Sequence, residues 1–269
     1  QLESSGMKQV LAGLQPQNLE DVIALISLYR PGPMDSIPTY LRNRHEPDKI
    51  SYKTPQLAHI LDVTNGCIVY QEQVMQIFRE LAGFSFGQAD NVRRAMSKKK
   101  HAVMEAEREH FVHGCTEPGH ECPGCVANGI SEKVANEIYD EMSSFASYAF
   151  NKSHAACYAY VAFQTAYLKC HYPSEFMAAL LTSVLDNTDK VIEYSGECAR
   201  LGIKVLPPDI NVSNGGFTAD ANGQIRFGLN AVKSVGRNLV ERVVAEREDR
   251  PYTSLYDFCK RMHGNELNR

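Results

Sequence analysis

The sequence predicts a mainly α-helical protein with a few short strands toward its C-terminus. Three observations support this fold class. Apolar residues recur at helical spacing through most of the first 200 positions, as at Val74, Ile77 and Phe78. Capping residues and helix-ending glycines or prolines bound these segments. Between positions 203 and 228, strand-like runs alternate with Pro-Pro, Asn-Gly and Gly-Gly turn signals.

The expected elements follow from these signals in chain order. Asn18 can cap a helix over 19–28, which Arg30-Pro31-Gly32-Pro33 ends abruptly because proline disfavours helix in the residue before it. The run 66–70 is strand-like. Further helices are expected over about 74–82, 88–112, 132–145, 155–172, 174–185, 188–202, 237–248 and 254–262, and strands over 203–206 and 224–228. Because 155–172 is apolar on nearly all sides, we expect it to be buried among the other helices.

Composition and length narrow the class of protein. Hydrophobic residues at 43% and charged residues at 22% are typical of a soluble globular protein. No apolar run approaches the roughly 18 residues that span a membrane, and no signal peptide begins the chain. Eight cysteines in 269 residues fit a reducing cytoplasm better than a secreted disulfide scaffold. The chain begins without Met, so we expect a fragment of a longer cytoplasmic protein with no membrane partner.

A basic cluster at Arg93–Lys100 is the first candidate site. It places five positive charges in eight residues of a chain whose net charge is -4. On a helix, Arg93, Arg94, Lys98 and Lys100 cover one side, while Lys99 turns away and Met96 faces the core. A solvated charged face is the common explanation of such a run. However, the run contains no acidic residue at i+4 to pair with it, so the repelling charges indicate an anionic partner such as phosphate.

A polar stretch before the apolar helix is the second candidate. Asn151, Lys152, Ser153 and His154 offer several donors at a helix N-terminus, where backbone N–H groups also point outward. That combination suits a triphosphate. The alternative is a plain capping segment in which Asn151 or Ser153 is the cap.

Three clustered cysteines give the third candidate. Cys115, Cys122 and Cys125 together with His120 have the ligand types of a closed, structural zinc site, and His113 or His110 is an alternative fourth ligand. The other reading is a loop with reduced free thiols.

A helix-hairpin-helix element is the fourth candidate. Val232–Gly236 followed by a helix from Arg237 has its outline, although Ser234 stands at the usual first hairpin glycine. Such hairpins present backbone N–H groups to DNA phosphates without reading sequence. No Asp-x-Asp pair and no Gly-x-x-x-x-Gly-Lys-Ser/Thr loop is present, so the sequence offers binding groups but no reaction centre.

Several long motifs in one order resemble the bacterial replicative DNA polymerase III alpha subunit, of the C-family of DNA polymerases. The resemblance covers essentially the whole chain and is to the fingers domain. The motifs are Arg30–Met34, Ile68–Met75, Arg93–Lys100, Phe150–Ala155, Ala166–Lys169, His171–Ala179 and Leu206–Asn211.

The resemblance implies roles for the candidate residues. In the family, the motifs matching Arg93–Lys100 and Asn151–His154 line the pocket of the incoming deoxynucleoside triphosphate, and Tyr158 would lie against its sugar or base. The three catalytic aspartates, which hold Mg²⁺, belong to a palm domain outside this chain, so the fragment alone should be inactive. Template-primer DNA is the expected partner, with the sliding clamp and other replisome subunits bound by other regions, in the nucleoid. The family usually lacks the cysteine insertion.

The expected organisation is a helical fingers core over 1–200, with a zinc-knuckle-like insertion at 113–126, and a small α/β segment over 201–269 that carries the hairpin. Two other functions fit some of the motifs. One is a non-enzymatic DNA-binding module that touches only phosphates and binds no nucleotide. The other is a metal-stabilised scaffold whose basic face serves an acidic protein.

Overall fold

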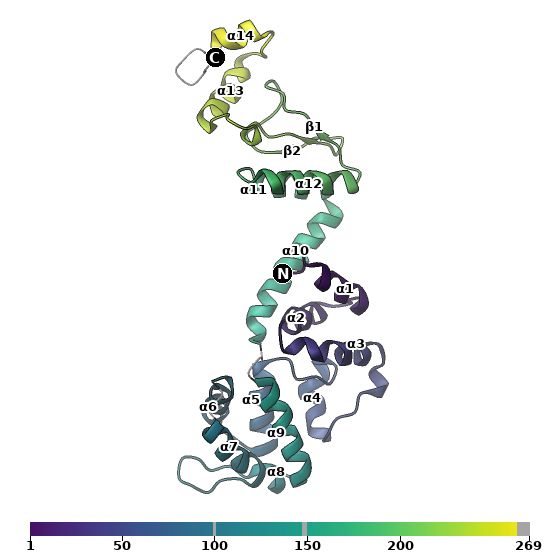
Figure 1. Ribbon diagram of the computed structural model, residues 1–269, viewed down its shortest axis with the longest axis vertical. Coiled ribbons are helices and arrows are strands. Elements are labelled where there is room, and N and C mark those ends of the chain that lie inside the picture. The colour runs from purple at the N-terminus through teal and green to yellow at the C-terminus, as the bar shows by residue number, and fades with distance from the viewer. Residues whose placement is uncertain (99–100, 147–149, 263–269) are drawn as a thin grey trace. The chain divides into compact units, whose positions relative to one another are not determined.

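A computed structural model describes residues 1–98, 101–146 and 150–262, and it confirms the mainly α-helical fold (Figure 1). The described residues form fourteen α-helices and three strands of two residues each. The chain divides into two compact units, 1–163 and 164–269, with the boundary inside helix α10 (Lys152–His171).

The first unit is entirely helical within its described residues. Its remaining α-helices are α1 (Ser5–Leu14), α2 (Leu19–Leu28), α3 (Ile37–His45), α4 (Ala58–Leu61), α5 (Gln71–Ala82), α6 (Phe86–Ser97), α7 (His101–His113), α8 (Gly124–Ala127) and α9 (Glu132–Ala146). Short 3₁₀ turns lie at Pro33–Ser36, Pro47–Lys49, Pro55–Leu57 and Asp62–Thr64. The predicted bounds of α2 are confirmed, and Asn18 Oδ1 accepts the backbone N–H of Asp21 as an N-cap should.

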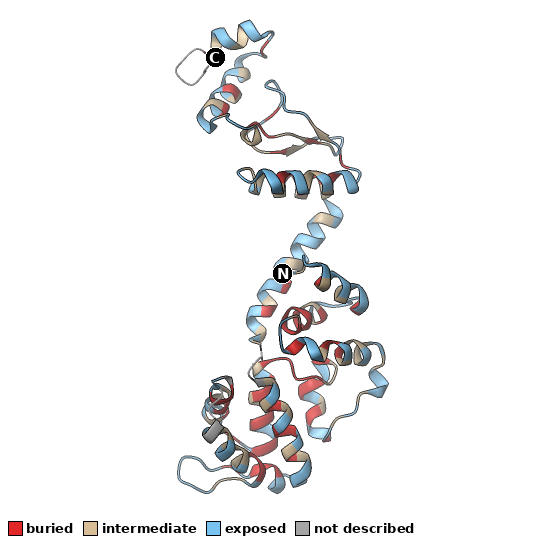
Figure 2. Ribbon diagram, in the orientation of Figure 1, coloured by how far each residue is buried: buried red, intermediate tan, exposed pale blue. Residues whose placement is uncertain are grey.

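Aromatic side chains form the centre of the larger core in this unit. Phe78 on α5 meets Phe111 on α7 and Tyr139 on α9 edge to face, with ring centroids 5.0 and 6.0 Å apart. This is the arrangement that aromatic quadrupoles prefer. Figure 2 shows the buried residues of α5 and α9 as red stripes along these helices. The helical spacing of Val74, Ile77 and Phe78 thus produces the apolar face that the sequence predicts.

The run 66–70, predicted to be a strand, is not one. Only Tyr70 makes an isolated parallel bridge, to Phe150. The backbone N–H groups of Val69 and Tyr70 instead donate to Gln73 Oε1, at 2.9 and 3.0 Å. A buried side-chain amide from the first turn of α5 therefore replaces the partner strand, and the apolar run joins a second core cluster with α2 and α3.

Helix α10 is not the buried helix that its composition predicts. Ala155 and Ala159 are its fully buried residues, and they pack into the second core cluster. On its other sides Tyr160 is 56% exposed and Phe163 58% exposed. The small alanines four residues apart let this one side approach the core closely, whereas the bulky side chains lie on the remaining sides.

The second unit combines helices with a small mixed sheet. Its elements are α11 (Pro173–Ser183), α12 (Thr188–Arg200), β1 (Val205–Leu206), β2 (Thr218–Ala219), β3 (Ile225–Arg226), a 3₁₀ turn at Leu229–Ala231, α13 (Arg237–Asp249) and α14 (Leu255–Arg261). β3 lies between β1, to which it is parallel, and β2, to which it is antiparallel. Ser174, where the sequence predicts the helix 174–185 to begin, is buried inside α11 because Pro173 begins the helix one residue earlier, and its hydroxyl donates to Gly223 O at 2.7 Å.

Candidate functional site

The basic cluster lies at the C-terminal end of α6. Met96 is fully buried, which confirms the predicted core side of this helix. The expectation that one helix continues through the cluster is wrong at Lys98, which caps α6 after Ser97. The helix dipole favours cations at a helix C-terminus, so the basic cluster is compatible with the end of a helix. Lys99 and Lys100 lie outside the described residues.

Asp90 pairs with both arginines of the cluster. Its Oδ1 accepts Nε and Nη2 of Arg93 at 2.9 and 2.7 Å, and its Oδ2 lies 2.7 Å from Nε of Arg94. The hydrogen bonds from Arg93 are the main reason that the pKa of Asp90 is lowered. The two arginines are therefore not an unpaired patch, as the run Arg93–Lys100 taken alone suggests. The compensating acid stands three and four residues before them, one helical turn upstream.

The two arginines differ in what they leave available. Arg93 also donates Nη1 to Gln71 Oε1 at 3.0 Å, and its side chain is only 20% exposed. Arg94 is 65% exposed, and within the described part of the chain only its Nε has a partner. Arg93 is thus largely engaged by Asp90 and Gln71, whereas the two Nη groups of the exposed Arg94 have no partner among the described residues.

The Asn151–His154 stretch forms the first turn of α10 and its cap. Asn151 Oδ1 accepts the backbone N–H of His154 at 3.0 Å, which is the capping arrangement that stood as the alternative to a ligand site. The backbone N–H of Lys152 points to the Glu72 carboxylate, at 3.2 and 3.3 Å. Lys152 Nζ lies 3.0 Å from Glu20 Oε2. Carboxylates of the protein therefore already contact two of the donors predicted for phosphate.

An aromatic row extends along the start of α10. The His154 ring lies 5.3 Å from Phe150 and 4.7 Å from Tyr158, centroid to centroid. The Arg30 guanidinium lies over the opposite end of this row, 4.5 Å from the Phe150 centroid. Arg30 belongs to the proline-rich loop that the sequence singled out, so this loop positions a cation beside the second motif. Tyr158 is 42% exposed.

Gln71 links the two motifs within the first unit. Its side chain accepts from Arg93 Nη1, and its backbone N–H donates to Phe150 O at 3.0 Å. The start of α5 thus lies between the end of α6 and the start of α10. Sequence reasoning missed Gln71, Glu72 and Asp90. Only Asp90 had a readable signal, its i+3 and i+4 spacing to the arginines.

The four predicted zinc ligands are not gathered around a common point. Among the described residues, no group of three or more His, Cys, Asp or Glu side chains is placed to hold a metal ion. Cys125 packs in the larger core, where burial raises the pKa of its thiol to about 12. Cys122 donates its thiol to His110 O at 3.6 Å, while His120 is exposed. The residues present therefore do not fit a closed tetrahedral site.

Backbone packing explains the turn residues of this insertion. Cys115 and Cys122 form an antiparallel bridge with two hydrogen bonds of 2.9 Å. Gly114 and Gly124 have φ of +88° and +79°, and a Cβ on Gly124 would lie 2.3 Å from the backbone N of Gly114. The Cys-Pro-Gly-Cys turn thus packs directly against the end of α7, which accounts for its glycine without a metal. We expect protein purified without added metal to hold less than about a tenth of an equivalent of zinc, whereas a structural site would hold one.

The hairpin in the second unit has the geometry that its sequence predicts. Ser234 has φ of +66°, the left-handed conformation for which glycine is the usual residue. It lies between the 3₁₀ turn Leu229–Ala231 and α13.

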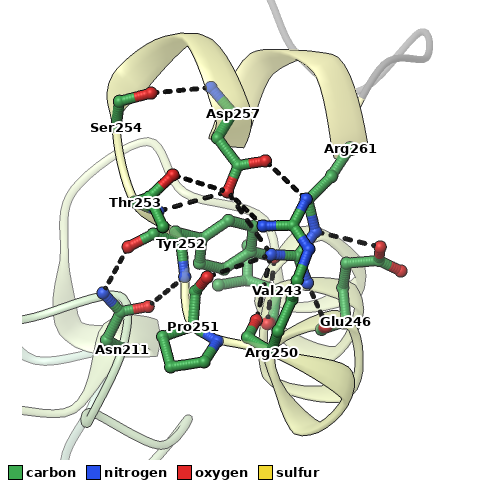
Figure 3. A network of polar contacts seen from close by, with 10 residues as sticks. All are labelled: Asn211, Val243, Glu246, Arg250, Pro251, Tyr252, Thr253, Ser254, Asp257 and Arg261. Carbon is green, nitrogen blue, oxygen red and sulfur yellow. Dashed lines mark hydrogen bonds and ion pairs between the residues drawn. The ribbon is translucent and has the colours of Figure 1, made fainter.

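A polar network closes the C-terminal side of this hairpin region (Figure 3). Asp257 on α14 accepts both Nη groups of Arg250, at 3.0 and 2.8 Å, and the backbone N–H of Thr253 at 3.1 Å. Arg261, whose side chain is 8% exposed, donates to the carbonyl oxygens of Glu246 and Arg250 and lies 3.6 Å from Asp257. These contacts tie α13 to α14.

No helix in the described part of the chain has the length and apolarity needed to cross a membrane. The arginines and helix-terminal donors of this region are groups that can bind anions.

Two family profiles match parts of the chain. The profile described as "Bacterial DNA polymerase III alpha subunit finger domain" matches residues 1–119, and a helix-hairpin-helix profile matches residues 202–269. The second match confirms the predicted helix-hairpin-helix element. Fold, site and profiles thus define the class: a fingers segment of a bacterial DNA polymerase, followed by a helix-hairpin-helix region.

Curated relatives identify the family within that class. The whole chain is 45% identical to the DNA polymerase III subunit alpha of Bacillus subtilis, 48% to that of Thermus aquaticus and 44% to that of Pasteurella multocida. The chain belongs to the family of bacterial DNA polymerase III alpha subunits. It spans 22 to 23% of the length of these three relatives.

Proposed function

We propose that this chain forms the nucleotide-binding wall of a replicative, template-directed DNA polymerase. In this proposal Arg93, Arg94 and Lys98 face the incoming deoxynucleoside triphosphate from the end of α6. The first turn of α10 faces it from the other side. One observation carries the proposal: the connection from Arg93 through Gln71 to Phe150, which joins two separate motifs in one unit.

The chemistry of the proposed wall is electrostatic. Guanidinium groups match phosphate oxygens in shape and charge, so Arg94 would orient the triphosphate and offset the charge that develops on the leaving pyrophosphate. His154 and Tyr158 offer aromatic surface for the sugar or base. Lys152 and Ser153 remain candidates for phosphate contacts, and Lys152 must exchange its contact with Glu20 to make one. Lys100 keeps its proposed phosphate role on sequence grounds alone.

In this proposal the catalytic magnesium is bound by another part of the full-length polypeptide. Magnesium held by carboxylates of that part would activate the primer terminus and neutralise the phosphates. This chain would bind and orient the incoming nucleotide and would exclude water from it. We therefore expect no nucleotide incorporation by the isolated chain, and measurable incorporation by the purified fragment would contradict the assignment.

The direct test is Arg93→Ala in the full-length polypeptide. We expect a raised apparent KM for the nucleotide, or a lowered kcat, with primer-template affinity nearly unchanged, because Arg93 sits in the network that joins the two motifs. Single-nucleotide incorporation and primer-template binding are measured on the same preparation. An equal loss of DNA affinity would instead assign Arg93 to the DNA backbone.

A second function is favoured by the helix-hairpin-helix match. We propose that the hairpin around Ser234 contacts the phosphate backbone of template-primer DNA without reading its sequence. The measurement is the dependence of DNA affinity on salt, whose slope reports the number of phosphates neutralised. Deletion of residues 232–236 should reduce that slope while the nucleotide KM stays constant, and an unchanged slope would contradict the proposal.

A further inference from the structure

The position of Asp90 between two arginines suggests a role that the sequence motifs do not assign. Asp90, Arg93 and Arg94 share one face of α6 at i, i+3 and i+4. Each carboxylate oxygen serves a different guanidinium: Oδ1 accepts from Arg93 and Oδ2 from Arg94. An aspartate at this position fixes the two cations in one arrangement.

The contact with Arg94 is the informative one. Asp90 engages Arg94 through Nε, which leaves Nη1 and Nη2 without a partner among the described residues. In a planar guanidinium bound at Nε, one Nη group lies beside Nε and the other points away from it, so N–H donors of both Nη groups remain for a second anion. The Arg94 side chain is 65% exposed, so an anion from solvent can reach these donors.

Arg93 anchors the arrangement from the inside. Its Nε and Nη2 bind Asp90, its Nη1 binds Gln71, and its side chain is 20% exposed. It therefore connects Asp90 to the start of α5 and, through Gln71, to Phe150. Arg93, which Gln71 holds in place, in turn fixes the position of the Asp90 carboxylate.

The charge balance remains favourable for an anionic ligand. One carboxylate between two guanidinium groups leaves a net charge of +1, and the C-capping Lys98 adds a second positive charge nearby. The lowered pKa of Asp90 keeps the carboxylate ionised at neutral pH. Asp90 thus orients the cations without cancelling them.

We propose that Asp90 is a positioning residue that holds the Arg94 guanidinium in the orientation that receives the triphosphate. The inference rests on the proposed nucleotide-binding function and adds the residue that organises it. A carboxylate that only screened the charge of the two arginines would give the opposite result, a lowered nucleotide KM when its charge is removed. The sign of the change therefore decides between them.

The test uses Asp90→Asn and Asp90→Glu in the full-length polypeptide. Asn keeps the shape but loses the charge and one of the two acceptors, so Arg94 is released. We expect the nucleotide KM to rise about fivefold, as for loss of a charge-assisted contact that orients a ligand. Glu also reaches i+3 and i+4 on a helix and should restore most of the affinity. Primer-template affinity should stay constant in both variants.

Asp140→Asn is the matched control. It removes one negative charge from the same unit and breaks a surface pair, Asp140 with Arg108 Nη2 at 2.6 Å, away from the cluster. Its nucleotide KM should equal that of the unmodified protein. Thermal unfolding of all variants shows whether the fold is retained.

Each outcome has a defined reading. A lowered or unchanged KM in Asp90→Asn overturns the positioning role, and a lowered KM indicates screening. A raised KM that Asp90→Glu fails to restore also overturns it. Arg94→Ala separates this failure from that of the proposed function: an unchanged KM in Arg94→Ala overturns both. A raised KM there, with no rise in Asp90→Asn, overturns only the role of Asp90.

Discussion

Two clusters of one aspartate with two arginines, one in each unit, use the same residue types for different ends. In the second unit Asp257 binds Arg250 and lies close to Arg261, and Arg261 also donates to backbone carbonyls, so that its side chain is 8% exposed. In the first unit Asp90 binds Arg93 and Arg94, and Arg94 is 65% exposed. The cluster around Asp257 in the second unit is therefore closed, and the cluster around Asp90 in the first unit is open.

The two clusters differ in the arginine N–H donors that remain once those bound to the aspartate are set aside. Around Asp257 the fork of Arg250 is used on the carboxylate and that of Arg261 on helix-terminal carbonyls, which joins α13 to α14 (Figure 3). Around Asp90 the fork of Arg94 is left over. Charge pairs alone therefore do not separate the two clusters, whereas the donors that remain on Arg94 do.

Thiol reactivity should show the largest contrast between the units. Cys125 in the first unit is buried with a thiol pKa of about 12, while Cys259 on α14 is exposed. Because the thiolate is the nucleophile, Cys125 should react with iodoacetamide at pH 8 about a thousandfold more slowly than Cys259. Mass spectrometry of timed digests measures both rates. Similar rates would mean that the core around Cys125 is open.

Removal of each aspartate should separate stability from binding. Asp257→Ala removes the acceptor of both Nη groups of Arg250 and one of the two carboxylates near the almost buried Arg261, so we expect the melting temperature of the second unit to fall by several degrees. Asp90→Ala should lower the melting temperature less, because solvent can receive Arg94. Circular dichroism during heating measures both. A larger loss in Asp90→Ala would reverse the assignment of closed and open clusters.

Acid should weaken the closed cluster. Hydrogen bonds from Arg250, followed by that from the Thr253 N–H, hold the pKa of Asp257 well below its ordinary value of about 3.9. A lowered folded-state pKa means that the stability contribution is complete above about pH 3.9 and is lost as pH falls further toward the folded pKa. Urea unfolding at pH 7 and pH 3 should therefore show a smaller loss for Asp257→Asn than for the unmodified protein. An equal loss would contradict the linkage.

The smallest expected effect concerns the hairpin. Ser234 holds a left-handed backbone conformation that costs a non-glycine residue about 1 kcal/mol, so Ser234→Gly should stabilise the second unit by roughly that amount. Ser153→Gly, at an exposed position in the first turn of α10, is a control in which the same exchange should not stabilise. Denaturant midpoints at constant slope measure both changes. Destabilisation by Ser234→Gly would show that the serine side chain itself is needed.

Local sequence signals predicted the elements well and their surroundings poorly. The Asn18 cap and the apolar spacing of Val74, Ile77 and Phe78 are properties of neighbouring residues, and those helices form as expected. The strand expected at 66–70 failed because Gln73, a residue of the next helix, takes its hydrogen bonds. The prediction that α10 is buried failed because a helix that is apolar on all sides gives no information on which of its sides pack against other elements.

The candidate site shows the same division. Residue types suggested phosphate binding at Arg93 and Arg94, and helical spacing placed Met96 in the core, as observed. The contacts of Glu72 with Lys152 and of Gln71 with Phe150 join positions about 80 residues apart, and no local pattern indicates them. The cysteine turn was assigned to zinc from its residue types and spacing, and the structure shows that its glycines also allow a close backbone approach in the core.

The most direct measurement of the central claim compares Arg94→Ala with Arg250→Ala in the full-length polypeptide. Steady-state incorporation at saturating primer-template gives the nucleotide KM of each. If the open cluster receives the triphosphate, Arg94→Ala raises KM about tenfold, equal to about 1.4 kcal/mol, while Arg250→Ala changes it less than about twofold. An unchanged KM in Arg94→Ala, or an equal rise in both variants, would contradict the account.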